Sequence, residues 1–157
     1  MISLRIPRDQ LAQQVRERFG GELRRAGTFA QIGMLGAVAC LEIAPPARSL
    51  GVLWFSTYGA REATQAALAE SAGGEPVMPF TFVATQPHLL STLLAQRGIP
   101  VTRAAFVHVA PPEWPAMLDM ARTWFGTCEA VLVGYVEEGQ PHCSDWRLLR
   151  RETTSSA

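Results

Sequence analysis

The sequence lacks lysine and asparagine altogether, and each absence excludes a type of chemistry. All 14 basic residues are arginine. Without lysine, the chain has no Schiff-base nucleophile and no P-loop lysine to contact a nucleotide phosphate. Without asparagine, it has no acceptor for N-linked glycans and no Asn-Gly hairpin turn.

Charge is also scarce, and neither sign is in excess. Charged residues make up 18% of the chain, and 14 acidic residues balance the 14 basic ones. Because a nucleic-acid-binding protein usually carries a basic excess or a basic stripe, we expect no nucleic-acid partner. The length of 157 residues is that of one domain with a sizeable core.

Cysteines are few, and no long hydrophobic run is present. Cys40, Cys128 and Cys143 are widely spaced and odd in number, which indicates a reducing compartment without a disulfide framework. The N-terminus carries early charges and lacks the apolar core of a signal peptide. The longest uncharged run, 26–41, has 16 residues and is short for a membrane span. We therefore expect a cytoplasmic protein with no membrane span.

Hydrophobic periodicity predicts that strands and helices alternate along most of the chain. Strands are expected over 4–6, 50–57, 101–110 and 130–137. Helices are expected over 11–19, 28–41, 60–72, 87–97 and 114–125. The proline-rich segment 75–87 is expected to be a loop, and 144–157 a frayed end. This order predicts an α/β fold with a layered, mostly parallel sheet.

Four segments, in chain order, carry a family resemblance. They are an arginine-bearing entry to an apolar helix (23–29), a strand and turn (53–59), a proline-rich loop with its following helix (79–100), and a strand ending in glycine and acid (129–138). In these segments the chain is similar to the N-terminal half of β-ketoacyl synthases. The resemblance implies a thiolase-like fold with α/β/α layers. It implies a single ketosynthase-like N-terminal domain over 1–157, with a variable N-terminal segment (1–22) and a frayed tail (150–157).

The resemblance also implies that the catalytic nucleophile is missing. The family places a cysteine between the strand matching 101–110 and the helix matching 114–125. Aligning Gly126 and Gly134 with the family puts that position at Val109, and no cysteine lies between Cys40 and Cys128. Pro111-Pro112 replaces the small residues that begin the family's nucleophile helix. The two histidines of the family's second half lie beyond this chain. We therefore expect no catalytic residues, no cofactor and no metal.

Chain length factors are ketosynthase-like proteins without a nucleophile, and this chain resembles them, in particular the small ones of aryl polyene pathways. Such a subunit pairs with an active β-ketoacyl synthase in fatty-acid, polyketide or aryl polyene biosynthesis, and meets the acyl carrier protein only indirectly. In the family, the strand matching 101–110 pairs across the dimer axis. The resemblance therefore implies an interface at Phe106, Val107, His108 and Val109. His88, where the family commonly has asparagine, and Phe82 are the candidate pocket residues.

Two other interpretations stay open at this point, one an enzymatic activity and the other a mode of assembly. The first is a small acyl-thioester hydrolase or transferase on a reduced thiolase-like scaffold, in which His108 or His88 acts with a water molecule. The second is a homodimer in which two half-domains make one pseudo-complete thiolase fold. Detection of acyl-thioester turnover would support the first, and the mass of the species in solution would test the second.

Several other polar or aromatic sets are expected to be structural. The segment 142–145 holds histidine, cysteine, serine and aspartate, but adjacent residues do not converge as a catalytic triad, so it is read as a polar loop. Glu137 and Glu138 should point to opposite faces of a strand and not pair. No histidine or cysteine spacing supports a metal site. Trp124 lies off the apolar stripe of its helix, and its exposure would suggest a protein contact.

Overall fold

The computed structural model describes residues 1–74, 76–110 and 113–151. Its strands are β1 (Ile2–Ile6), β2 (Leu50–Ser56), β3 (Val101–His108), β4 (Ala130–Glu137) and β5 (His142–Arg150). Its helices are α1 (Leu11–Phe19), α2 (Gly27–Glu42), α3 (Arg61–Ala72), α4 (Pro79–Ala84), α5 (Leu89–Gln96) and α6 (Trp114–Arg122). Two short 3-10 helices, η1 (Arg8–Gln10) and η2 (Thr123–Gly126), complete the elements.

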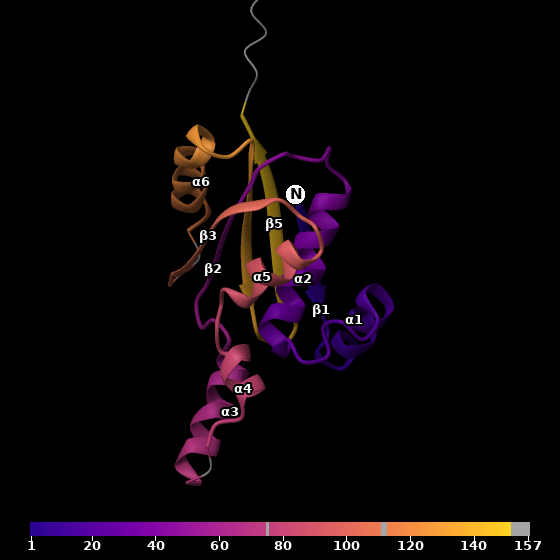
Figure 1. The fold of residues 1–157 in the computed structure, drawn as a ribbon, viewed down its shortest axis with the longest axis vertical. Coiled ribbons are helices and arrows are strands. Elements are labelled where there is room, and N and C mark those ends of the chain that lie inside the picture. Colours follow the sequence, from indigo (N-terminus) through magenta and orange to yellow (C-terminus); the bar gives the residue numbers. More distant parts are fainter. Residues whose placement is uncertain (75, 111–112, 152–157) are drawn as a thin grey trace, which may run out of the picture.

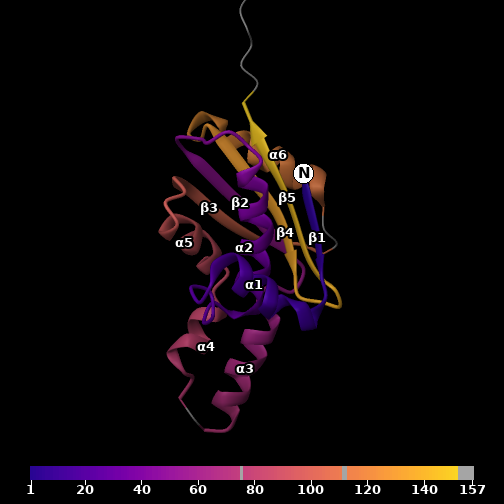
Figure 2. The ribbon, with the colours of Figure 1, turned by 90° about the vertical axis from the view of Figure 1, so that its right-hand side faces the viewer.

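The strands form one five-stranded sheet in the order β1-β5-β4-β2-β3 (Figure 2). The α/β fold is confirmed, but the sheet is mixed where a mostly parallel one was expected. β2 is parallel to β3 and to β4, whereas β5 is antiparallel to both β4 and β1. The reversal follows from a short connection: only residues 138–141 separate β4 from β5, and a turn of that length joins antiparallel neighbours.

Helices cover both faces of the sheet, which gives the α/β/α layers that the resemblance implies (Figure 1). α2 packs on one face against β4 and β5, with α1 and α5 beside it, and α6 packs on the other face over β2 and β4. As its sequence predicts, α2 is apolar nearly all round and mostly buried. One apolar cluster fills the α2 side of the sheet and a smaller one fills the α6 side.

The expected loop over 75–87 is wrong, because it contains helix α4. Pro79 stands at the start of this helix, where its missing N–H is no loss and its fixed φ suits the first turn. Met78 before it is extended, with a φ of −62° and a ψ of 138°. Glu70 of α3 supports the same turn, since its carboxylate accepts hydrogen bonds from the Met78 N–H and the Thr81 hydroxyl.

The expected polar loop at 142–145 and the frayed end from residue 144 are also wrong. Residues His142–Arg150 form β5, which lies inside the sheet between β1 and β4. His142, Ser144 and Trp146 are buried on the α2 side, and the residues between them face the α6 side. These intervening polar residues lower the apolar content of the segment, which concealed the strand. Of the expected tail 150–157, Arg150 belongs to β5, and residues 152–157 lie outside the described part.

The remaining elements follow the prediction with small changes at their ends. β3 ends at His108, and Pro111-Pro112, expected to end the strand, lie outside the described residues. The helix predicted over 114–125 is α6 followed by η2. Trp124 is buried against the α6-side core, so an exposed contact by this residue does not arise. Residues 1–22 contribute β1 and α1 to the fold.

α3 and α4 project beyond one end of the sheet as an arm (Figures 1 and 2). We call these two helices the α3–α4 arm. Neither helix has a buried residue, and the two pack mainly against each other. Most of the large exposed apolar side chains of the described residues lie on this arm or directly before α4, namely those of Leu68, Met78, Phe80, Phe82 and Val83. The arm is therefore held to the body by a few contacts at its base.

Candidate functional site

The predicted interface strand, β3, lies at an edge of the sheet. Its pairing with β2 runs from Leu50 opposite Val101 to Ser56 opposite His108. The Val109 N–H continues this ladder by donating to the Ser56 carbonyl, with an N–O distance of 3.1 Å. Along a strand, the main-chain groups of successive residues face alternate sides. The N–H and C=O groups of Phe106 and His108 therefore face the free edge of the sheet.

The four candidate interface residues share this edge but not one face. Phe106 packs with the α2-side cluster, whereas Val107 and Val109 pack with the α6-side cluster. His108 lies on the Phe106 side, since the two rings are 4.8 Å apart at their centroids. What the four residues have in common is therefore their position in and directly after the last part of β3.

An aromatic cluster lines the α2 side of this edge. The Phe106 ring contacts those of Phe29, Trp54 and His108 at centroid distances of 5.9, 5.8 and 4.8 Å. Trp54 in turn meets His88 edge to face at 5.7 Å. The structure thus brings His88, a predicted pocket residue, next to the predicted interface. Phe82, the other predicted pocket residue, is 58% exposed on α4 and does not belong to this cluster.

The position expected for a nucleophile holds no thiol. The Val109 side chain is half-buried against the α6-side core. Cys128 is buried near the beginning of β3, with its Sγ 3.6 Å from the Thr102 hydroxyl, at the opposite end of the strand from Val109. Cys40 is a buried residue of α2, and burial raises the pKa of its thiol. Burial also raises the pKa of Cys143, which lies on β5, away from the β3 edge.

Two adjacent glutamates at the end of β4 bind separate backbone segments, which sequence reasoning missed. Glu137 Oε2 accepts hydrogen bonds from the Ser56 hydroxyl (3.0 Å), the Thr57 N–H (2.7 Å) and the Tyr58 N–H (3.4 Å). It thereby holds the turn that follows β2. Glu138 accepts instead from the backbone N–H of Glu62 at the start of α3, at 2.7 Å. The two carboxylates thus anchor neighbouring parts of the segment that leads into the arm.

The polar residues of 142–145 serve the packing of β5. Ser144 Oγ donates to the carbonyl of Ile32 at 2.8 Å and accepts from the Trp146 indole at 2.9 Å. Asp145, on the other face, binds Arg5 at 2.6 and 3.0 Å. Strand alternation puts Cys143 on the opposite face from His142, and the Ser144 hydroxyl binds the Ile32 carbonyl and the Trp146 indole, while His142 Nδ1 accepts from the Gly139 N–H. Among the described contacts, the segment therefore does not pair a nucleophile with a base.

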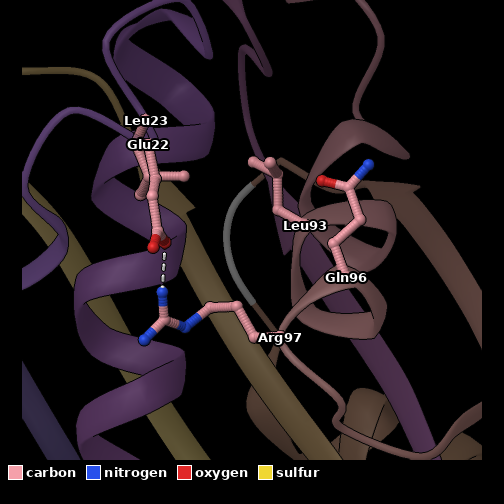
Figure 3. Close-up of a pocket in the computed structure, with 5 residues that line it drawn as sticks. All are labelled: Glu22, Leu23, Leu93, Gln96 and Arg97. Carbon is pink, nitrogen blue, oxygen red and sulfur yellow. Dashed lines mark hydrogen bonds and ion pairs between the residues drawn. The ribbon is translucent and has the colours of Figure 1, made fainter.

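A surface pocket of about 440 Å³ lies between the turn before α2 and the end of α5 (Figure 3). Leu23 and Leu93 line its walls together with Gln96, and an ion pair between Glu22 and Arg97 crosses it. The opposite charges in this pocket are already paired. Among the described residues, no group of three or more metal-ligating side chains is placed to hold a metal ion. No helix in the described ranges is long and apolar enough to cross a membrane.

Comparison with known proteins identifies the fold. No protein-family model matches the sequence, and no curated protein matches it. The ketosynthase ApeO in complex with its chain length factor ApeC from Xenorhabdus doucetiae matches with a TM-score of 0.69 and 15% identity, over 83% of this chain and 60% of that chain. The ishigamide ketosynthase/chain length factor matches with a TM-score of 0.73 and 14% identity, over 90% of this chain and 49% of that chain.

The chain therefore has the thiolase-like fold of the subunits in ketosynthase/chain length factor complexes, which confirms the resemblance at the level of the fold. It spans about half to three fifths of the length of the chains it matches.

Proposed function

We propose that this chain is a non-catalytic, chain-length-factor-type subunit that pairs with an active β-ketoacyl synthase through the free edge of β3. The pathway would be a fatty-acid, polyketide or aryl polyene one, with the acyl carrier protein meeting the ketosynthase partner. The observation that carries the proposal is the edge itself, an open strand whose second half is largely apolar. It ends at His108, directly before Val109, where the resemblance places the family's nucleophile. The fold shared with ketosynthase/chain length factor complexes supports it.

The two edges of the sheet differ in a way that favours β3 as the interface. β1 has five residues, and its Ser3 and Arg5 side chains both bind Asp145 on β5. Short length and charge are the usual means by which an edge strand avoids pairing with other chains. β3 has eight residues, and the half nearest Val109 is apolar apart from His108. The unpaired backbone groups of such an edge are available to pair with a strand of another chain.

The alternative function, acyl-thioester hydrolysis or transfer, needs an oriented imidazole. A histidine base is normally oriented by a hydrogen bond from its other ring nitrogen to a carboxylate or carbonyl. In the described part of the chain, the ring contacts of His88 and His108 are aromatic ones, to Trp54 and to Phe106. This environment suits packing at an interface better than general-base catalysis.

The test is co-expression with the candidate ketosynthase and its acyl carrier protein, followed by co-purification and analysis of product chain length. His108→Pro removes the N–H that faces the free edge and leaves the ladder to β2 intact, because proline is tolerated on edge strands. His108→Ala is the matched control, since it removes the imidazole and keeps the N–H. We expect wild type and His108→Ala to co-purify with the ketosynthase and His108→Pro to lose it.

Other outcomes would contradict the proposal. A protein that stays monomeric, with no effect on product length, would refute pairing. A homodimer of the chain alone that His108→Pro dissociates would favour self-association of two half-domains. Turnover of acyl-pantetheine thioesters by the isolated chain that His108→Ala or His88→Ala abolishes would establish the hydrolase or transferase instead.

A further inference from the structure

A small set of contacts attaches the α3–α4 arm to the body. Glu62, at the start of α3, binds Arg8 of η1 at 2.8 Å and accepts from the Thr28 hydroxyl of α2 at 2.9 Å. Gly27 and Ala84 meet closely, since a Cβ on Gly27 would lie 2.8 Å from that of Ala84. Arg25 stacks on the Phe80 ring at 4.5 Å. A helical segment held by so few contacts belongs to the low-stability part of a protein.

Glu138 lies at the centre of this attachment and is almost fully buried, with 3% of its surface exposed. One of its carboxyl oxygens accepts the Glu62 N–H at 2.7 Å, which caps an orphan donor at the start of α3. Its other oxygen, Oε1, has no hydrogen-bond partner among the described residues. A buried carboxyl oxygen without a partner is costly when the group is ionised and much less so when it is protonated.

His142 is buried in the same region, with 1% of its surface exposed. Its Nδ1 accepts the N–H of Gly139, and its Nε2 has no partner in the described part of the chain. Burial lowers the pKa of His142, so the ring gives little positive charge to offset an ionised Glu138. The attachment thus contains a buried carboxyl group and a buried imidazole, each with one unpaired polar atom.

We propose that Glu138 is a pH-sensitive anchor of the α3–α4 arm: protonated, it holds the start of α3 against the sheet, and its ionisation loosens that attachment. The proposal concerns the chain itself and does not depend on the proposed ketosynthase partner.

The charges around Glu138 explain the direction of the effect. The pKa of Glu138 is raised to about 7, mainly by burial and in smaller part by the nearby carboxylates of Glu62 and Glu137, against opposing contributions from the Glu62 N–H and from Arg61. Around His142, Glu62 favours the charged ring, whereas Arg8 and burial disfavour it. Water stabilises an ionised Glu138, and it reaches the carboxylate when the start of α3 moves away from the sheet.

The experiment measures the carboxyl group and the arm separately in the full chain by NMR. The side-chain carboxyl carbon of Glu138, assigned by its loss in Glu138→Gln, is followed as a function of pH. Amide exchange of Glu62, whose N–H binds Glu138, is compared with that of Ala121 in α6. We expect a carboxyl midpoint near 7 and a rise of about tenfold in the Glu62-to-Ala121 exchange ratio from about pH 6 to about pH 8.5.

Two variants make the result specific. In Glu138→Gln the ratio should stay constant over the same range, because the amide is always neutral and still accepts the Glu62 N–H. Glu17→Gln removes one exposed carboxylate from α1 and should behave as wild type. A Glu138 midpoint near the ordinary glutamate pKa of about 4.3 would overturn the proposal. So would an exchange ratio independent of pH in wild type, a measurement that needs no variant to fold.

Discussion

The indole ring of Trp146 lies directly against Gly134 across the β4–β5 pair, where a Cβ on the glycine would come within 2.3 Å of the ring. The two residues are opposite each other in the register, and Trp146 is fully buried. Gly36 of α2 borders the same ring from the other layer, with a Cβ 2.5 Å from the indole Cδ1. The two glycines thus make the space in which β5 and α2 pack together.

This packing predicts that Gly134→Ala destabilises the fold. The added methyl group overlaps a rigid ring in the core, and overpacking of this kind costs about 1–3 kcal/mol. Gly126→Ala is the control, since a Cβ there meets nothing within 4 Å. Urea denaturation measures both. An equal free energy of unfolding for the two variants would mean that the core accommodates the methyl group and the argument fails.

Ser144 gives a second prediction about stability. Its hydroxyl donates to the Ile32 carbonyl and accepts the Trp146 N–H, both in the buried interior. Ser144→Ala leaves an indole N–H unsatisfied, which costs about 1–3 kcal/mol. Ser91→Ala, which removes an exposed hydroxyl bonded to the His88 carbonyl, should change stability much less. Thermal unfolding distinguishes the two variants, and similar losses would argue against the network.

Glu138 predicts a fall in global stability as pH rises. Its pKa in the folded state, about 7, lies above the ordinary glutamate value, so the folded chain binds a proton that the unfolded chain has lost. Stability contributed by this proton is complete below the unfolded pKa and is lost as pH rises through about 7, by at most about 3.5 kcal/mol. Glu138→Gln should flatten this part of the profile. An unchanged slope in the variant would assign the pH dependence elsewhere.

His142 acts in the opposite direction at lower pH. Burial lowers its pKa in the folded state, so the unfolded chain takes up a proton first as pH falls below the ordinary histidine value of 6.5. We expect His142 to reduce stability progressively below that pH. His142→Gln, which does not titrate, should remove this loss, and His88→Gln is the exposed control. Denaturation curves across the acidic range make the comparison, and equal profiles for both variants would contradict it.

Val109 offers a chemical test of the proposed interface. Val109→Cys places a thiol at the end of the β3 edge, half-exposed, whereas Cys128 is buried. We expect a maleimide to label the new thiol faster than Cys128, with the extra label identified by mass spectrometry. Addition of the ketosynthase partner should slow labelling at position 109 only. Labelling that the partner does not change would place the interface elsewhere.

Local patterns in the sequence predicted most of the elements. The apolar residues of α2, β2 and β4 form nearly continuous runs, because each segment is buried on nearly every side. These runs predicted the helix and the two strands correctly. The two errors have local causes. Polar residues on the α6 side of β5 diluted its alternating pattern, and Pro79, read as a loop signal, begins helix α4.

The sequence by itself determined the α/β class, the absence of a thiol near Val109 and the order of segments that carries the family resemblance. The tertiary structure alone decided which strand lies at an edge, because strand order depends on contacts between residues far apart in the chain. It also decided that Glu138 meets the start of α3. Glu62 and Glu138 are 76 positions apart in the chain. Only the packing of the arm against the sheet brings the Glu138 carboxylate to the Glu62 amide and removes water from that carboxylate.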